Sequence, residues 1–491
     1  MLSLIRRSRR PAALVLALVL CLTPFGAVAD TYKIENGDIT VEAGENGQSV
    51  NGVSDDTPVI ITSDDPSTPS AHTVTITAEA GATANVTLQN LIIDTRVDPT
   101  NDYSDGAAAV ATSGAGAVVI ELEGSTTLTS GYPHAGLEKG NGGSLTIQDE
   151  NNDGGSLTAS GGYLGAGIGS GSQGGASGII ITGGTVVAMG GASGAGIGGG
   201  NHGDGSNIEI TGGTVVAMGG ASGAGIGGGQ AGNGEHIKIT AGTVTAVGGI
   251  WAAGIGGGYG GSGDHIEISG GTVIAVGGDT APGIGGGAVS IEGEGGQGTD
   301  ITVSGSAQVS AAGGAEDAWG FGTGAAIGNA GDQDGGKPVA GAEAEDTGEL
   351  HTEGLYTTGS ISYYPAGTTA EEIRNKEVAP VKVVRGTVEP PVEEEPEARE
   401  EDPFAAFTER LVWQIRTAPE KGVVEAGAGN WPGLQRAVFE ALAKRTDVTL
   451  KITCRMNGEK TTLTIPGTAD LMTPLGSGWM LSFEEIAKAL G

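Results

Sequence analysis

The sequence predicts an all-β protein whose main part is a parallel β-helix solenoid with 29-residue coils, followed by a small α+β module. Three observations predict the solenoid. The ten residues GASGAGIGGG at 191–200 recur unchanged at 220–229, and apolar residues recur every 29 positions around them. Between these residues, apolar and polar side chains alternate and glycine pairs interrupt them. Such alternation is typical of short strands separated by turns.

Three apolar tracks carry the period. Their members are Ile168, Ile197, Ile226, Ile255 and Ile284; Ile179, Ile208, Ile237 and Ile266; and Val186, Val215, Val244 and Val273. Burying the large apolar side chains of one unit gains on the order of 10 kcal/mol, whereas ordering its backbone costs about 30 kcal/mol or more. One unit therefore cannot fold alone, and we expect the units to stack as rungs about 4.8 Å apart.

Each unit contains three predicted strands. Residues 208–211 alternate apolar and polar side chains, a glycine pair follows, and residues 214–218 form the second strand. The third strand, at 224–227, has one large side chain among glycine and alanine. Outward positions should vary in polarity from unit to unit, as Glu209, Lys238 and Glu267 do at equivalent sites, which places a cation between two anions.

The repeat becomes less regular toward both ends. Segments 85–93, 118–128 and 144–147 read as irregular coils before it, and 301–303 with 325–328 as one more coil after it. Repeat arrays need atypical ends, so we place the β-helix at residues 30–346 and an irregular closing segment at 347–388.

The N-terminal 29 residues predict a secretory signal peptide, because four arginines precede a short apolar run and an Ala-Val-Ala cleavage site. We therefore expect a secreted or cell-surface protein without a membrane span. Removal of the signal changes the net charge from −34 to −38, and such a surface repels nucleic acid. Only Cys454 remains, so no internal disulfide can form.

The C-terminal part has a different composition. Residues 389–402 are rich in Pro and Glu and predict an extended linker. Beyond it, at 403–491, Leu434, Val438 and Leu442 have helical spacing, and strands at 448–454 and 461–465 flank Asn457-Gly458, a hairpin signal. Ser482 and Glu485 predict a capping box.

The glycine-rich coils, in which ITGGTVVAMGG precedes GAGIGGG, resemble those of exported right-handed parallel β-helix proteins of Gram-positive anaerobes. These proteins are often classed as carbohydrate-binding, and their architecture is distantly similar to that of pectate lyases. The resemblance covers roughly residues 88–328 and implies a right-handed solenoid. It implies little about function, because β-helices support lyases, glycosidases, adhesins and ice binders.

Aromatic residues form the first candidate site. Trp251 replaces the serine or threonine of the neighbouring coils, and Tyr259 replaces Asn or Gln. Sugar rings stack on exposed aromatic side chains, so these two residues, together with Tyr163 and Trp319, are candidate glycan-binding residues. Phe321 would extend this aromatic surface. Alternatively, these side chains cover a coil edge or pack against the C-terminal module.

A metal loop is the second candidate. Asp149, Asn151 and Asp153 match the first positions of a calcium loop, but Ser160 stands where the bidentate Glu should be. A solvated turn explains the same residues. A calcium ion at this loop is therefore the one cofactor candidate, and no organic cofactor is expected. The sequence 332–335 is a weaker match.

Stacked histidines are the third candidate. His236 and His265 occupy the same coil position, and two imidazoles on adjacent rungs could share a metal, although repetition alone also produces such a pair. Catalysis finds less support in the regular coils, where Lys238 is the only basic side chain apart from histidines and the carboxylates form no matched acid and base pair.

The leading interpretation is a non-enzymatic exported protein that binds an extracellular polysaccharide or cell-wall glycan through one face of its solenoid. The alternatives are a polysaccharide lyase or hydrolase with its site on the irregular N-terminal coils, and an adhesin or spacer that acts through the C-terminal module. The sequence does not predict the oligomeric state.

Overall fold

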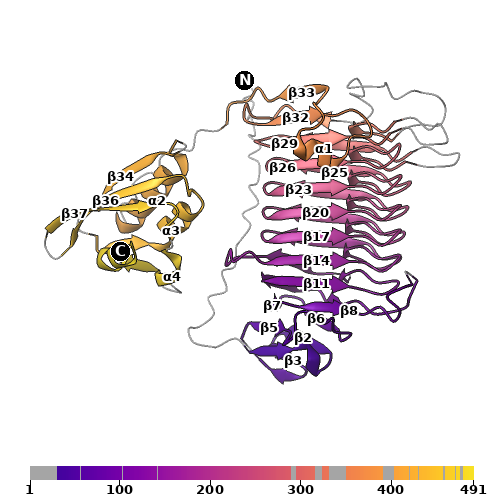
Figure 1. Ribbon diagram of the computed structural model, residues 1–491, viewed down its shortest axis with the longest axis horizontal. Coiled ribbons are helices and arrows are strands. Elements are labelled where there is room, and N and C mark those ends of the chain that lie inside the picture. The colour runs from indigo at the N-terminus through magenta and orange to yellow at the C-terminus, as the bar shows by residue number, and fades with distance from the viewer. Residues whose placement is uncertain are drawn as a thin grey trace, which may run out of the picture. The chain divides into compact units, whose positions relative to one another are not determined.

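The computed structural model describes residues 30–55, 57–101, 103–140, 142–288, 295–315, 323–330, 350–390, 403–419, 421–428, 431–456, 459–469, 471–475 and 479–490. The chain divides into two compact units, Met1–Pro390 and Pro391–Gly491. The first is a parallel β-helix and the second a small α+β module (Figure 1), which confirms the predicted fold class.

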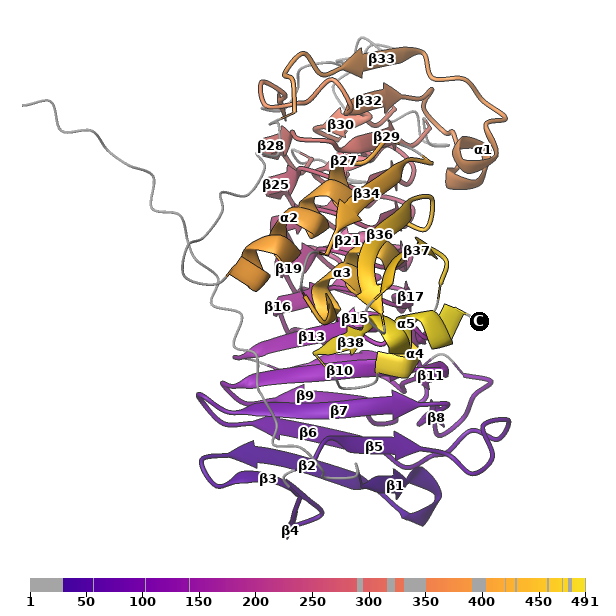
Figure 2. The same ribbon diagram turned by 90° about the vertical axis from the view of Figure 1, so that its left-hand side faces the viewer.

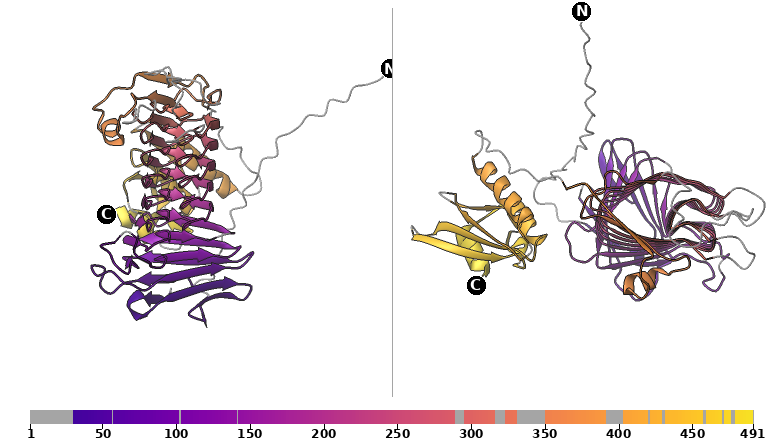
Figure 3. Two further views of the ribbon diagram at one scale, coloured as in Figure 1. Left: turned by 90° about the vertical axis from the view of Figure 1, so that its right-hand side faces the viewer. Right: turned by 90° about the horizontal axis from the view of Figure 1, so that it is seen from above.

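Three long sheets, A, B and C, form the solenoid, and each regular coil contributes one strand to each sheet. Seen along the solenoid axis, the sheets enclose a common interior (Figure 3). The strands of sheet A, in their order across the sheet, are β1 (Thr31–Lys33), β5 (Val59–Thr62), β7 (Thr83–Gln89), β10 (Ala117–Glu123), β13 (Ser144–Gln148), β16 (Ala176–Ile181), β19 (Gly205–Ile210), β22 (Gly234–Ile239), β25 (Gly263–Ile268), β28 (Gly298–Val303) and β31 (Leu350–His351).

Sheets B and C are built in the same way, and the stacked strands are visible in Figure 2. The strands of sheet B are β4 (Val53–Ser54), β3 (Gly47–Val50), β2 (Ile39–Gly44), β6 (Val74–Ala78), β9 (Val110–Ser113), β12 (Leu137–Lys139), β15 (Ile168–Gly169), β18 (Ile197–Gly198), β21 (Ile226–Gly227), β24 (Ile255–Gly256), β27 (Ile284–Gly285) and β30 (Ile327–Gly328). Those of sheet C are β8 (Ile92–Asp94), β11 (Ser125–Thr129), β14 (Ser156–Ser160), β17 (Thr185–Met189), β20 (Thr214–Met218), β23 (Thr243–Val247), β26 (Thr272–Val276), β29 (Gln308–Ala312), β32 (Ser360–Tyr363) and β33 (Lys382–Arg385).

The register of the regular coils confirms the three apolar tracks. Ile197 pairs with Ile226 in sheet B, and equivalent residues pair in the other two sheets: Ile208 with Ile237 in sheet A and Val215 with Val244 in sheet C. All the members of the three tracks are fully buried. Each track is therefore a column of stacked side chains, and together the columns form one continuous core.

Close stacking of backbones explains the glycine content of the turns. At Gly220, an added Cβ would lie 1.7 Å from the carbonyl oxygen of Gly191 on the adjacent rung, and at Gly249 it would lie equally close to that of Gly220. In sheet B, Gly198 has a φ of +134° and Gly227 of +133°, a conformation that glycine adopts without steric cost. Both turn and strand therefore require glycine.

The two ends of the solenoid depart from the repeat. Near the N-terminus, β3 pairs antiparallel with β2, and a 3-10 helix, η1 (Ile34–Asn36), follows β1. At the other end, β31 and β32 add parallel pairs to sheets A and C, and β33 closes sheet C antiparallel to β32. The helix α1 (Ala370–Asn375) packs its Ile373 against the outer side of sheet C at Val276 and Ala312.

The C-terminal module contains helices α2 (Pro403–Thr417), α3 (Arg436–Ala443), α4 (Met472–Leu475) and α5 (Phe483–Leu490). Its strands are β34 (Val423–Gly427), β35 (Gly433–Gln435), β36 (Thr449–Met456), β37 (Glu459–Pro466) and β38 (Met480–Ser482). The predicted capping box is confirmed, because the backbone amide of Glu485 donates to Ser482 Oγ at 3.2 Å and that of Ser482 donates to Glu485 Oε2 at 2.8 Å.

One detail of the module differs from expectation. Leu434 lies in β35, not in a helix, because α3 begins only at Arg436, although Val438 and Leu442 occupy its buried side as predicted. The backbone of Leu434 pairs antiparallel with that of Leu481 in β38. The Asn457-Gly458 turn lies outside the described residues.

Candidate functional site

Aromatic side chains gather along one corner of the solenoid, where the chain turns from sheet C into sheet B and on into sheet A. Trp251 lies in the turn between β23 and β24, and Tyr259 in the turn between β24 and β25. The two turns lie side by side, because the Tyr259 amide donates to the carbonyl of Ser222, which is the residue one rung before Trp251, at 2.9 Å. The ring centroids of Trp251 and Tyr259 are 5.6 Å apart with planes inclined by 57°.

A second aromatic pair occupies the same corner on an earlier coil. Tyr163 lies in the turn between β14 and β15, and its ring centroid is 4.1 Å from that of Tyr103, which is 61% exposed. We call Tyr103, Tyr163, Trp251 and Tyr259 the aromatic edge. The structure thus unites Trp251 with Tyr259 as a pair but places Tyr163 three rungs away.

The register adds two residues to this corner. Tyr132 lies one rung before Tyr163, because Leu137 pairs with Ile168 in sheet B. Ile250 lies three rungs after Tyr163. Ile250 is 46% exposed. From Tyr132 to Ile250 there are four rung steps, which corresponds to about 19 Å of solenoid. The corner therefore presents apolar side chains over a length suited to an extended ligand.

The Trp251 side chain costs folding free energy in its present setting. Its indole N–H is buried and has no hydrogen-bond acceptor among the described residues, a loss of about 1–3 kcal/mol. Two coils earlier the same position is Ser193, whose hydroxyl donates to Gln230 Oε1 at 3.0 Å. A hydrogen-bonded polar side chain thus fits this position of the coil. The unpaired indole N–H of Trp251 therefore indicates that this tryptophan has a role other than packing.

The remaining aromatic candidates have different outcomes. Trp319 and Phe321 lie outside the described residues. Tyr103 was not predicted, since it belongs to the long connection between β8 and β9, which does not follow the 29-residue period. Its aromatic character was the only signal in the sequence.

The predicted calcium loop is a tight turn between β13 and β14. The amide of Asp153 donates to Asp149 Oδ1 at 3.3 Å, and the amide of Asn151 donates to Glu121 Oε1 at 3.4 Å. Burial raises the pKa of Asp153, and the nearby charges of Asp149 and Glu123 raise it further. Among the described residues no group of three or more His, Cys, Asp or Glu is arranged to hold a metal ion. Calcium binding at this turn stays a prediction.

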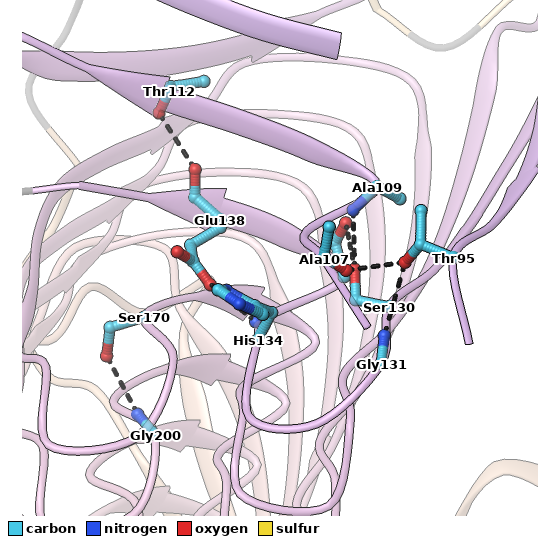
Figure 4. Close-up of polar contacts among 12 residues, drawn as sticks. Thr95, Ala107, Ala109, Thr112, Ser130, Gly131, His134, Glu138, Ser170 and Gly200 are labelled. Carbon is cyan, nitrogen blue, oxygen red and sulfur yellow. Dashed lines mark hydrogen bonds and ion pairs between the residues drawn. The ribbon is translucent and has the colours of Figure 1, made fainter. Parts of the chain in front are cut away.

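The irregular coils contain a titratable pair that the sequence did not single out, shown in Figure 4. His134 Nδ1 lies 2.9 Å from Glu138 Oε2, which also accepts the amide of Ala135 at 3.0 Å. The hydrogen bond with Glu138 raises the pKa of His134, against the effect of burial. The neighbouring Lys139 is buried, and burial lowers the pKa of its ammonium group. The only signal in the sequence was the spacing of a His and a Glu at a coil corner.

The stacked histidines lie on the outer face of sheet A. The rings of His236 and His265 are 4.8 Å apart and nearly parallel, at an angle of 10°. They line a groove of about 510 Å³ together with Glu209, Lys238 and Glu267. His265 already bonds to carboxylates, with Nδ1 2.7 Å from Asp264 Oδ2. His265 is therefore part of an ion-paired surface.

Comparison with known proteins agrees with the fold. A family model described as a β-helix repeat matches residues 153–172, 179–201, 208–230, 237–259 and 266–288. No curated protein and no solved structure matches the chain. Within the described part of the chain, no helix is both long enough and apolar enough to cross a membrane. The chain therefore contains a parallel β-helix with recognised repeats, and Tyr163, Trp251 and Tyr259 of the aromatic edge lie within the matched segments.

Proposed function

We propose that this β-helix-repeat protein is exported and acts in the extracellular space or at the cell surface as a non-enzymatic glycan-binding protein. The observation that carries the proposal is the aromatic edge, with two aromatic pairs at one corner of a rigid solenoid. At the same corner positions the intervening coils carry Ala192, Ser193, Ala221 and Ser222. Aromatic rings present a wide apolar surface to the apolar face of a sugar ring.

The architecture supports an extended ligand. Stacked rungs hold the aromatic side chains at fixed spacing along one direction, so the ligand loses entropy on binding but the protein loses little. The turns that carry Trp251 and Tyr259 are tied to neighbouring rungs by backbone hydrogen bonds, such as that from the Ala288 amide to the Trp251 carbonyl at 2.8 Å. The binding groups are therefore preorganised.

Retention on insoluble glycans tests the proposal. The purified mature chain should be retained on at least one polysaccharide of a panel that contains cellulose, chitin, mannan, polygalacturonate and alginate. Trp251→Ala and Tyr163→Ala should each weaken retention by about tenfold, which corresponds to about 1.4 kcal/mol of binding free energy. Tyr356→Ala, a tyrosine outside this corner, is the control and should bind as the wild type does. Unchanged retention of both edge variants would remove the aromatic edge from the function.

A polysaccharide lyase or hydrolase is the second candidate, and the His134–Glu138 pair favours it. A histidine held by a carboxylate is suited to accept a proton from a substrate. Incubation of the chain with polygalacturonate or alginate, with and without calcium, would reveal unsaturated products by ultraviolet absorbance or new reducing ends. Activity that is lost in His134→Ala would replace the non-enzymatic proposal with this one.

A further inference from the structure

The outer face of sheet C carries no charge over five consecutive rungs. In β11, β14, β17 and β20, the first, third and fifth residues point outward, as their alternating burial indicates. The register places Thr243, Thr245 and Val247 of β23 at the same positions, where Thr245 is itself buried. Every one of these outward residues is Ser, Thr, Val or Met. On a chain with a net charge of −34, an uncharged face of this extent is distinct from sheet A, where Glu209, Lys238 and Glu267 point outward at successive rungs.

This face, which we call the neutral face, is bounded on three sides. At its N-terminal end, Asp94 pairs with Thr129 across the sheet and forms an ion pair with Arg96 at 2.6 Å. At its other end, Ile373 of α1 covers Val276. Along one long side the strands of sheet C lead directly into the turns of the aromatic edge, since Tyr163 follows the end of β14 by three residues and Trp251 follows that of β23 by four.

We propose that an extended neutral polysaccharide lies along the neutral face, with its sugar rings held on one side by the aromatic edge. The proposal rests on the glycan-binding function proposed above and names the class of glycan. Threonine and serine hydroxyls can exchange hydrogen bonds with sugar hydroxyls, while the methyl groups of Thr, Val and Met contact apolar sugar faces.

Charge argues against an acidic polymer. A carboxylate placed on this face would lose water and find no cation among the outward residues of β11 to β23, which is unfavourable. The overall negative charge of the protein would also repel a polyanion. A neutral chain meets neither obstacle.

Area argues against a second copy of the protein as the occupant. Four rung steps by the length of a five-residue strand give about 250 Å² for the flat face, whereas a stable interface buries about 800 Å² on each partner. A polysaccharide needs no such area, because its contacts extend along the chain and onto the aromatic edge.

Opposite charges introduced at one position test the inference. Val216 lies in the centre of the neutral face, and the next rung carries Thr245 at the equivalent position. Val216→Glu and Val216→Lys should each reduce retention on neutral polysaccharides of the panel by tenfold or more, because either charge would lose water against a neutral ligand. Thr211→Glu and Thr211→Lys, beyond the end of β19 on the sheet A side, are the matched controls and should change little. If a Val216 variant fails to fold by circular dichroism, the same charges at the exposed Thr214 replace it.

The outcomes separate this inference from the proposed function. The inference predicts that the wild type prefers cellulose, chitin or mannan to polygalacturonate and alginate, and that both charged variants lose this binding. If Trp251→Ala weakens binding but both Val216 charges leave it unchanged, the neutral face is not the site and the glycan-binding function stands. Improved binding to polygalacturonate by Val216→Lys, combined with a wild-type preference for acidic polymers, would overturn the neutral class. A wild type that is retained on no polysaccharide overturns the proposed function and this inference together.

Discussion

Replacement of Gly220 by alanine tests the stacking of coils in the most local way. The added Cβ would lie 1.7 Å from the carbonyl oxygen of Gly191, and carbon atoms in proteins do not approach other heavy atoms closer than 3.0 Å in such contacts. The rungs would have to separate by about 1.3 Å at this corner, since both atoms belong to rigid backbone. Forced separation of packed groups costs about 1–3 kcal/mol, and more where the backbone cannot yield.

The free energy of unfolding of Gly220→Ala should therefore fall by about 3 kcal/mol, measured by urea denaturation with far-ultraviolet circular dichroism. Gly175→Ala is the control. There the added Cβ would lie 3.5 Å from the Asp204 carbonyl oxygen, an ordinary contact, and the same position carries Asp204, Asn233 and Ser262 in the following coils. The control should lie within about 0.5 kcal/mol of the wild type. A Gly220→Ala protein as stable as the control would refute the close approach of adjacent rungs.

Three further predictions concern charges. Lys238→Ala should cost less than about 1 kcal/mol, with the loss smaller still in high salt, because the Lys238–Glu267 ion pair at 3.5 Å is exposed; a larger loss in thermal melts would contradict the exposed register. The hydrogen bond with Glu138 raises the pKa of His134 in the folded state. The stability that this pair contributes is therefore complete below the unfolded pKa of histidine, about 6.5, and it disappears as the pH rises through the higher pKa of the folded state. His134→Gln should thus destabilise the protein more at pH 5.5 than at pH 8.5 in urea titrations, and equal losses would argue against the pair. Asp153→Asn should slightly stabilise the calcium-free protein at pH 7, since the raised pKa of Asp153 means that its charge is unfavourable in the fold; a calcium-induced rise in melting temperature in the wild type but not in this variant would establish the calcium site.

The regular coils could be predicted because the same constraint is repeated in every unit. An apolar residue in each of three columns, such as Ile226 in sheet B, must face the interior, and glycine must stand wherever rungs touch. The pairing register of adjacent strands followed from the 29-residue period alone, and Glu209 pairs with Lys238 as expected. The periodic pattern therefore contained both the strands and their stacking.

The ends of the chain could not be predicted in the same way. The strands β1 to β6 lie in a part of the chain where the distance between successive strands in the sequence varies. There the backbone amide of Asn85 donates to Gln48 Oε1 at 2.9 Å, and these two residues belong to no common motif. Leu434 had helical spacing, but pairing with β38 placed it in a strand. Tertiary contacts decided the structure of these segments.

The candidate site was predictable only in part. Departure from the repeat identified Trp251 and Tyr259, and their rings do meet. Tyr103 lies in a connection of irregular length, so no spacing in the sequence indicated its contact with Tyr163. The neutral face is a property of outward positions on several rungs, which become one surface only when the register is known.

Disulfide formation across adjacent rungs measures the register most directly. In a Cys454→Ser background, Thr185→Cys combined with Thr214→Cys places the two residues on paired positions of β17 and β20, where the Cα separation of about 4.8 Å allows a disulfide. Thr185→Cys combined with Val216→Cys shifts one partner by two residues along β20, to a separation of about 8 Å that is too long. We expect rapid oxidation of the first pair and none of the second within the monomer. Equal crosslinking of both pairs, or crosslinking of the second alone, would contradict the 29-residue register on which the proposed faces depend.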